Sequence, residues 1–308
     1  MERLRIASRK SPLALRQAEI VSAALRRSHP RLRVEIVGMT TEGDRLAAAP
    51  GPLPEGKSLF TKELEKSLLE GRADVAAHSM KDVAAEMPED LSICAVLERA
   101  DPRDALLSDA FPDLAALPAR ARVGTSSLRR RSQLLALRPD LQVVELRGNV
   151  GTRIARMEQG NCDALVLAAA GLERLGLKAR IREYLAPGVL IPAIGQGAIG
   201  IQARRGHGRA IGLLAALDHE PSRLRVVAER ALSLELQGSC RLPVAAHAEL
   251  RRGQLRVRGM VGRPDGGKLV IAAGAGPARE AAMVGCRLAR QLLLAGADSI
   301  LRELGVAI

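Results

Sequence analysis

The sequence is poor in aromatic residues. Its 308 residues contain two Phe, one Tyr and no Trp. Proteins that bind single-stranded nucleic acid stack bases on aromatic side chains, and this chain has almost none to offer. The formal net charge of +13 therefore indicates a small anionic ligand at least as well as a nucleic acid.

Cysteine is also scarce, and the four cysteines lie far apart in the chain. No Cys-x-x-Cys pair occurs, so the sequence predicts neither a zinc site nor a disulfide framework. No apolar segment near the start is typical of an export signal, and no uncharged run is long enough to cross a bilayer. We expect a cytoplasmic monomer with no metal and no membrane partner.

One cysteine lies among turn-forming residues. Gly238 and Ser239 precede Cys240, and Pro243 follows it. These residues interrupt both helix and strand, so the thiol is predicted to lie on a connecting loop, where ligand chemistry is often placed. A functional thiol and a small residue that fills a turn are both compatible with this pattern.

The chain contains an approximate repeat. Residues 4–39 predict a strand, a polar loop, a helix capped by Ser11 and a second strand. The same order returns in residues 122–146, and residues 69–75 resemble residues 158–164. This repetition predicts two similar α/β lobes with a ligand cleft between them.

Arginines begin one predicted helix of the second lobe. Residues 129–131 are all Arg and follow a cap at Ser126 or Ser127. The helix dipole disfavours each cation there by roughly 0.3 to 1 kcal/mol, so a bound anion would resolve the conflict. Residues 147–153 show a similar pattern, in which a strand is expected to end at an arginine before glycines and a helix. Arginine pairs well with carboxylates, although solvated surface arginines are the alternative.

Residues 51–58 match the phosphate-loop pattern G-x-x-x-x-G-K-S. Such a loop needs consecutive backbone N–H groups, and the prolines at positions 52 and 54 remove two of them. A nucleotide site is therefore disfavoured. A loop that brings Lys57 and Phe60 to the cleft is the preferred functional interpretation, and a solvated loop is the alternative.

A charged pair follows a predicted buried strand of the first lobe. Residues 73–77 are apolar apart from one aspartate, and Lys81 and Asp82 come shortly after them. The carboxyl ends of strands are where α/β proteins place their active sites. An ion pair at the strand exit is one interpretation. In a cleft of arginines, however, a carboxylate indicates proton transfer or stabilisation of a cation.

Together these segments resemble the porphobilinogen deaminase (hydroxymethylbilane synthase) family, from Arg5 to about Leu304. The segments that carry the resemblance are residues 8–15, 78–83, 124–130, 146–153, 192–197 and 238–240. Two positions depart from the family pattern, because Ser58 replaces a usual Gly and Ala84 a usual Pro. Neither departure removes a chemical group, so the expected activity is unchanged.

The resemblance implies a covalent cofactor. Cys240 would carry a dipyrromethane through a thioether, and four porphobilinogen molecules would be joined to it head to tail. Ammonia and linear hydroxymethylbilane would be released, and Asp82 would be the catalytic residue that serves the pyrrole nitrogens and the electron-poor intermediate. The residues expected to bind cofactor or substrate are Arg9, Ser11, Gln17, Lys81, Thr125, Ser127, Arg129, Arg130, Arg147 and Arg153. Lys57 is expected to join them because the loop of residues 51–58 would bring it to the cleft.

The implied fold is α/β, with two periplasmic-binding-protein-like lobes containing mixed sheets and a small C-terminal α+β domain that carries the cysteine. The first lobe is expected in residues 1–97 with 198–216, the second in 103–191 and the C-terminal domain in 220–308. The product would pass to the next enzyme of tetrapyrrole (heme) biosynthesis. A solute-binding protein is the main alternative, but it would need no loop thiol.

Overall fold

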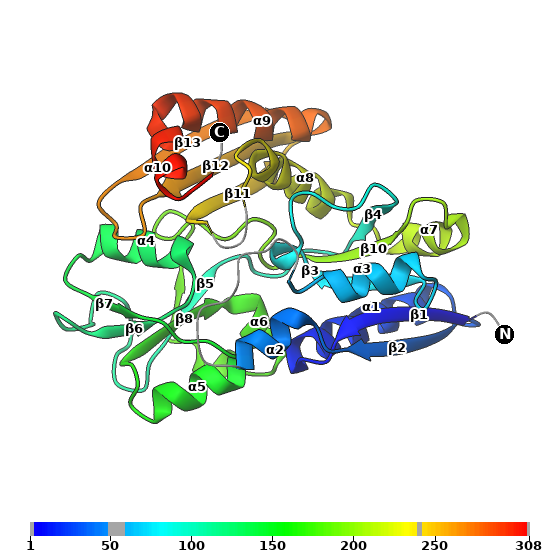
Figure 1. Cartoon of the computed structure of the whole chain (residues 1–308), viewed down its shortest axis with the longest axis horizontal. Helices are drawn as coiled ribbons and strands as arrows, with labels where there is room; N and C mark the ends of the chain where they lie inside the picture. The colour runs from blue at the N-terminus through cyan, green and yellow to red at the C-terminus, as the bar shows by residue number, and fades with distance from the viewer. Residues whose placement is uncertain (1–2, 49–58, 239–241, 307–308) are drawn as a thin grey trace. The chain divides into compact units, whose positions relative to one another are not determined.

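The computed structural model describes residues 3–48, 59–238 and 242–306, which contain three β-sheets (Figure 1). Contacts divide the chain into two compact units. The first is Met1–Ala100 with Ala198–Arg223, and the second is Asp101–Gly197 with Leu224–Ile308. The second unit thus contains both the expected second lobe and the expected C-terminal domain, and the three-part boundaries stay a prediction.

The sheet of the first unit has five strands in the order β2-β1-β3-β10-β4. The strands β1 (Arg3–Arg9), β2 (Arg33–Met39) and β3 (Val75–Ser79) are parallel to one another. The strand β10 (Ile199–Arg204) is antiparallel to both of its neighbours, β3 and β4 (Leu91–Val96). The helices are α1 (Pro12–Ser28), α2 (Glu42–Ala48), α3 (Lys62–Leu69) and α7 (Gly208–Leu214), with 3-10 turns η1 (Met80–Asp82) and η3 (Ala215–Leu217).

The first sheet of the second unit repeats this topology, with the order β7-β6-β8-β5-β9. Its strands are β5 (Asp104–Leu107), β6 (Arg122–Gly124), β7 (Gln142–Val144), β8 (Ala164–Ala168) and β9 (Glu183–Leu185). Here β6 is parallel to β7 and β8, whereas β5 is antiparallel to β8 and β9. Its helices are α4 (Leu128–Leu137), α5 (Val150–Glu158) and α6 (Ala169–Arg174), with the 3-10 turn η2 (Lys178–Arg180). The predicted pair of similar lobes with mixed sheets is confirmed.

Helices cover both faces of each five-stranded sheet, because successive side chains of a strand point to opposite faces and here both sets include buried apolar residues. In β1, Ile6 packs in the same core as Val21 of α1, whereas the next residue, Ala7, packs with Leu64 of α3. In the second unit, β5 and β8 alternate in the same way between α4 on one face and α5 with α6 on the other.

The same ion pair joins the strands of both lobes. The backbone N–H of Arg5 donates to Asp74 Oδ2 (2.8 Å), and the guanidinium reaches Oδ1 (3.0 Å). At the equivalent place, the N–H of Arg122 donates to Asp163 Oδ2 (2.6 Å) and its guanidinium to Oδ1 (2.9 Å). In each lobe this ion pair and its backbone hydrogen bond fix one strand start beside its neighbour: β3 beside β1, and β8 beside β6.

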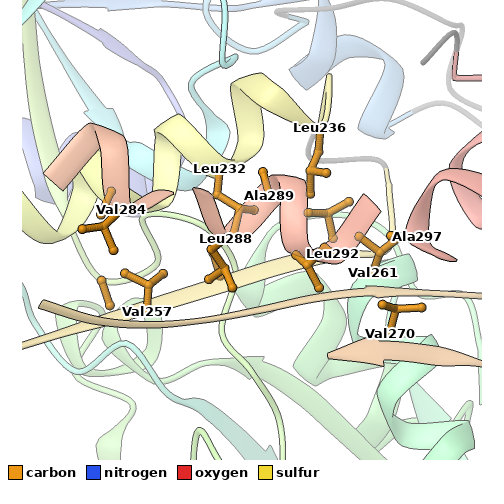
Figure 2. Close-up of a cluster of buried hydrophobic side chains, with 14 of the residues drawn as sticks. Leu232, Leu236, Val257, Val261, Val270, Val284, Leu288, Ala289, Leu292 and Ala297 are labelled. Atoms are coloured by element: carbon orange, nitrogen blue, oxygen red, sulfur yellow. The ribbon is translucent and has the colours of Figure 1, made fainter. Parts of the chain in front are cut away.

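The C-terminal sheet is an antiparallel meander of β11 (Val244–Arg251), β12 (Gln254–Gly262) and β13 (Leu269–Pro277). Its helices are α8 (Glu220–Glu235), α9 (Ala281–Leu292) and α10 (Asp298–Glu303), with a 3-10 turn η4 (Ala278–Glu280) and a π-helical turn η5 (Leu293–Ala297). Leu232 of α8, Leu288 of α9 and Val257 of β12 meet in one core (Figure 2). The small α+β domain expected from the sequence is confirmed.

One strand is shorter in the structure than the sequence predicted. Residues 141–146 were expected to be extended up to Arg147, but β7 ends at Val144. Arg147 therefore lies on the connection to α5 rather than at the end of the strand. In the described part of the chain, no helix combines the length and the apolar character needed to cross a membrane.

Substitution by alanine should change the stability of the protein in opposite directions at two helical glycines. A Cβ atom at Gly285 in α9 would overlap the backbone oxygen of Ala228 in α8, whereas a Cβ at Gly212 in α7 would meet nothing. We expect Gly285→Ala to lower the free energy of unfolding by about 1–3 kcal/mol through overpacking. Gly212→Ala should raise it by about 0.5–1 kcal/mol. Urea unfolding of both variants tests this, and equal effects would contradict the close approach of the two helices.

Candidate functional site

A small cleft of about 40 Å³ lies in the first unit, at the carboxyl ends of β1 and β3. This is the edge of a parallel sheet at which ligand sites are expected. The polar and aromatic side chains that line it include Arg9, Ser11, Gln17, Phe60, Ser79 and Asp82. Four of these, Arg9, Ser11, Gln17 and Asp82, are among the predicted site residues, and the fold brings them together.

Arg9, the last residue of β1, is held by several neighbours. Its Nε donates to Asp44 Oδ1 (3.1 Å), and its guanidinium lies 4.4 Å from the centroid of the Phe60 ring. Burial alone would raise the pKa of Asp44, but hydrogen bonds from Arg9 and Thr41 outweigh it and lower the pKa. Asp44 is therefore held as a carboxylate, and it fixes the orientation of the arginine.

Asp82 lies on the other side of the same guanidinium. Its Oδ2 is 3.9 Å from Arg9 Nη1, and 34% of its side chain is exposed. Its turn, η1, is anchored by the buried side chain of Met80, and a Cβ at Gly200 would overlap the Met80 sulfur. The turn thus presents a partly exposed carboxylate from a fixed position, which is suited to binding a donor or stabilising a cation.

Two further predicted residues, Gln17 and Ser11, line the same cleft. The amide of Gln17 donates to Ser79 Oγ (2.7 Å), so its orientation is fixed. Ser11 is the N-cap of α1 and accepts from the N–H of Ala14 (3.4 Å), as expected from its position before Pro12. Lys81 lies in the same 3-10 turn as Asp82.

In the second lobe, the predicted serine and threonine shape the start of α4. Ser127 rather than Ser126 is the N-cap, and its Oγ accepts from the N–H of Arg130 (3.4 Å). Thr125 Oγ1 accepts in turn from the N–H of Ser127 (3.2 Å). Both hydroxyl groups therefore take part in the loop that joins β6 to α4.

Arg129 and Arg130 contact a buried carboxylate. Asp104, the first residue of β5, has no exposed surface, and its Oδ2 accepts from Arg129 Nη1 (2.7 Å). Its Oδ1 accepts from Arg130 Nη2 (2.8 Å) and from Gln196 Nε2 (3.0 Å). Burial alone would raise the pKa of Asp104, but the two guanidinium groups hold it well below the usual range.

An anion that resolves the electrostatic conflict at this helix is therefore present within the protein. The arginines are also nearly buried, with exposed fractions of 4% for Arg129 and 5% for Arg130. Asp104 was not among the predicted residues, and nothing in its local sequence distinguishes it. A role for Arg129 and Arg130 in binding ligand carboxylates stays a prediction.

The segment between β7 and α5 carries two more predicted arginines. Arg147 Nε donates to Glu145 Oε1 (2.6 Å), and 25% of the Arg147 side chain is exposed. Arg153 Nε donates to the carbonyl oxygen of Gly148 (2.8 Å). Gly148 has a φ of +105°, a conformation that favours glycine, so this turn brings the backbone and both arginines into one polar segment.

Arg174, at the end of α6, was missed by the sequence prediction. Burial lowers the pKa of its guanidinium to about 10, and its Nη2 donates to the carbonyl oxygen of Gly197 (2.7 Å). A partly desolvated cation after the central strand β8 is a candidate for anion binding. The only sequence signal for Arg174 was its position shortly after the small residues Ala169–Gly171. A run of small residues usually indicates close packing of a helix rather than a binding site.

Two predicted residues, Lys57 and Cys240, lie outside the described residues, so both stay predictions. The three described cysteines, Cys94, Cys162 and Cys286, are free thiols. Burial raises the pKa of Cys162 to about 11, which makes it a poor nucleophile at neutral pH. In the described ranges, no group of three or more His, Cys, Asp or Glu residues is placed to hold a metal ion.

Two family models match most of the chain. One, described as the porphobilinogen deaminase dipyromethane cofactor binding domain, matches residues 4–211. The other, described as the porphobilinogen deaminase C-terminal domain, matches residues 223–294. The chain belongs to the porphobilinogen deaminase family. As a member of this family it is a transferase of the hydroxymethylbilane synthase type, and its N-terminal part is a dipyrromethane-binding domain.

Solved structures of other proteins are more distantly similar. The periplasmic VFT2 domain of BvgS from Bordetella pertussis is 19% identical, with a TM-score of 0.41, and the match covers 70% of this chain and 86% of that one. A YaeC-family lipoprotein from Enterococcus faecalis is 13% identical (TM-score 0.42; coverage 71% and 92%). The periplasmic aliphatic sulphonate binding protein SsuA from Escherichia coli is 17% identical (0.39; 76% and 75%). A shared fold does not imply a shared function, so these proteins leave the ligand of this chain open.

The Asp104 cluster predicts a large loss of stability when its carboxylate is removed. Asp104→Asn leaves two buried guanidinium groups without their anion, which should lower the free energy of unfolding by about 3–5 kcal/mol. Urea unfolding at pH 7 measures this loss. Asp109→Asn is the matched control, because Asp109 is exposed and its ion pair with Arg180 (3.3 Å) should contribute little.

The stability lost in Asp104→Asn should depend on pH. Because the folded-state pKa of Asp104 lies below its unfolded value, its stabilising contribution is complete above about pH 4 and is lost as the pH falls below that. The stability difference between the wild type and Asp104→Asn should therefore shrink in acid. A difference that is independent of pH, or no larger than that of Asp109→Asn, would contradict the assignment.

Proposed function

We propose that the chain condenses four porphobilinogen molecules head to tail on a dipyrromethane primer attached to Cys240, with loss of one ammonia at each step. Water then cleaves linear hydroxymethylbilane from the primer, which stays on the protein. Family membership supports a transferase of tetrapyrrole biosynthesis. The observation that carries the finer proposal is the cleft of the first lobe, where the Asp82 carboxylate lies 3.9 Å from the Arg9 guanidinium. An anion-binding cation and a partly exposed carboxylate are the two groups that this chemistry needs.

The donors of the chain fit a ligand of this type. Each pyrrole unit of the dipyrromethane or of the substrate brings two carboxylates, and arginine pairs with carboxylates through two parallel hydrogen bonds. In the second lobe, Arg147 and Arg153 lie on the polar turn around Gly148. In the first lobe, Ser11 lines the cleft that contains Asp82, and Lys81 lies in the same 3-10 turn as Asp82. We assign these residues, with Thr125, Ser127, Arg129 and Arg130, to the cofactor and the growing chain.

When bound, the dipyrromethane supplies the end to which the first substrate unit is joined. The chain's own residues bind and stabilise the substrate. Arg9, oriented by Asp44 and Phe60, binds a substrate carboxylate, and Gln17, held by Ser79, donates beside it. Loss of ammonia leaves positive charge on the substrate, and Asp82 stabilises that charge and accepts from the pyrrole N–H.

The remaining parts of the proposal rest on the sequence. The wide spacing of the cysteines supports a reducing cytoplasm. We expect the chain to work as a monomer and its product to be consumed by the next enzyme of the tetrapyrrole route. Lys57 is assigned to substrate binding from its loop.

Replacing the Asp82 carboxylate predicts a loss of turnover rather than of binding. Asp82→Asn keeps the size of the side chain but removes its charge, so kcat should fall by about 10²–10³-fold while KM changes little. Steady-state formation of hydroxymethylbilane measures both constants. Asp90→Asn is the control, because Asp90 is an exposed aspartate of the same lobe that lies outside the cleft. Near-wild-type turnover of Asp82→Asn would contradict the role of this residue.

The intact mass of the purified chain tests the covalent primer. We expect an excess over the sequence mass equal to a dipyrromethane, and the excess should be absent in Cys240→Ala. Cys286→Ala is a control that should retain the added mass, because Cys286 belongs to α9 and not to the predicted loop. If the wild type shows no excess even after incubation with porphobilinogen or hydroxymethylbilane, the proposed function is wrong.

A further inference from the structure

The second unit contains a larger hollow that the proposed function does not use. It has a volume of about 410 Å³ and lies on the face of the C-terminal sheet opposite α9. The residues that form it are Arg256 and Arg258 of β12, His247 and Glu249 of β11, and Ala273 and Ala275 of β13, with Pro187 and Gly188 at one side. None of them is among the residues assigned to porphobilinogen or its primer.

The register of the strands explains why the hollow exists. Arg258 is paired with His247 on one side and with Ala273 on the other, and Arg256 with Glu249 and Ala275. Side chains at these alternating positions point to the same face. The long arginines therefore lie beside a floor of alanines. The opposite end of this face is covered, because Ile191 packs there on Ala245 and Met260.

Arg256 and Arg258 of β12 differ from Arg251 of β11 in their ion pairing. Arg251 lies 3.3 Å from Glu249. Among the interactions of the described residues, no ion pair or side-chain hydrogen bond includes Arg256 or Arg258. The acid of the hollow, Glu249, also lies 3.9 Å from His247 Nε2. Two exposed guanidinium groups thus face the hollow, while its carboxylate is already shared by two neighbours.

We infer that this hollow binds a small planar molecule with two carboxylates. Residues two apart on a strand are about 7 Å apart, so the two guanidinium groups can each bind one carboxylate of the same molecule. The alanine floor suits the face of an aromatic or heterocyclic ring, and the volume matches that of ordinary small-molecule sites. The site is a binding site for an effector or a second substrate molecule, separate from the Asp82 cleft.

The alanine floor supplies a local probe of binding. We would label the alanine methyl groups of the full chain with ¹³C and titrate benzene-1,3-dicarboxylate up to about 10 mM, a range that detects weak binding. Ala273→Ser and Ala275→Ser identify the two signals. Saturable shifts of both signals are expected. Benzoate, with one carboxylate, should bind at least about fivefold more weakly.

Variants then test the residues. Arg256→Ala with Arg258→Ala should weaken binding by at least about tenfold, because both carboxylates lose their partners. Ala273→Leu should have a similar effect by filling the floor while it keeps both charges. Arg302→Ala is the control for loss of positive charge, since Arg302 lies on α10 and pairs with Asp298 (3.4 Å). It should leave binding unchanged, and the urea midpoints of all variants should match the wild type.

Porphobilinogen is also a planar molecule with two carboxylates, so it is titrated in parallel with the Asp82→Asn variant, which turns over slowly. Shifts of the floor signals with porphobilinogen assign the hollow to a second substrate molecule, whereas shifts with the benzene dicarboxylate alone assign it to another effector. The inference is overturned if neither probe shifts the floor signals, or if the shifts persist in the double arginine variant. Because the readout is local, failure here is distinct from failure of the mass and turnover tests.

Discussion

The buried carboxylate of Asp104 is the interaction on which the second lobe depends. It joins the start of β5, the first turn of α4 and the segment that contains Gln196. Arg129 also donates to the carbonyl oxygen of Ile191 (2.7 Å), and Arg130 donates to that of Val166 (2.9 Å). Two cations at a helix start oppose the helix dipole and would be costly to bury alone. Their shared anion stabilises both the start of α4 and the start of β5.

The two lobes have the same skeleton and different chemistry. Each is held by an arginine and an aspartate at the equivalent strand joint, Arg5 with Asp74 and Arg122 with Asp163. Beyond that joint they diverge. The first lobe presents Asp82 with about a third of its side chain exposed, whereas the second lobe places Asp104 out of contact with solvent. The same topology thus contains a partly exposed carboxylate, which we propose for the ligand, in one lobe and a carboxylate that pairs within the protein in the other.

Much of this fold could be predicted from the sequence because its signals are local. Ser11 before a proline marked the start of α1, and the matching segments around Asp74 and Asp163 marked the repeat. The helix dipole also favoured an anion beside Arg129 and Arg130, with solvated surface arginines as the alternative. The identity of that anion was not evident, because Asp104 lies 25 residues before Arg129 and meets it only through strand pairing. The end of β7 before Arg147 was missed because the exposed Glu145 and the buried Leu146 continue the alternation of a strand after β7 has ended.

The strand order of the first lobe has a consequence for synthesis of the chain. β10 lies between β3 and β4, although it follows β4 in the chain by about a hundred residues. Until the ribosome has released that strand, β4 has no neighbour in the sheet and its apolar side chains stay uncovered. All five strands of the second lobe lie between residues 104 and 185, so the sheet of the second lobe can be completed before that of the first. Folding on the ribosome usually begins with the N-terminal domain. In this chain the lobe that is started second can be completed first.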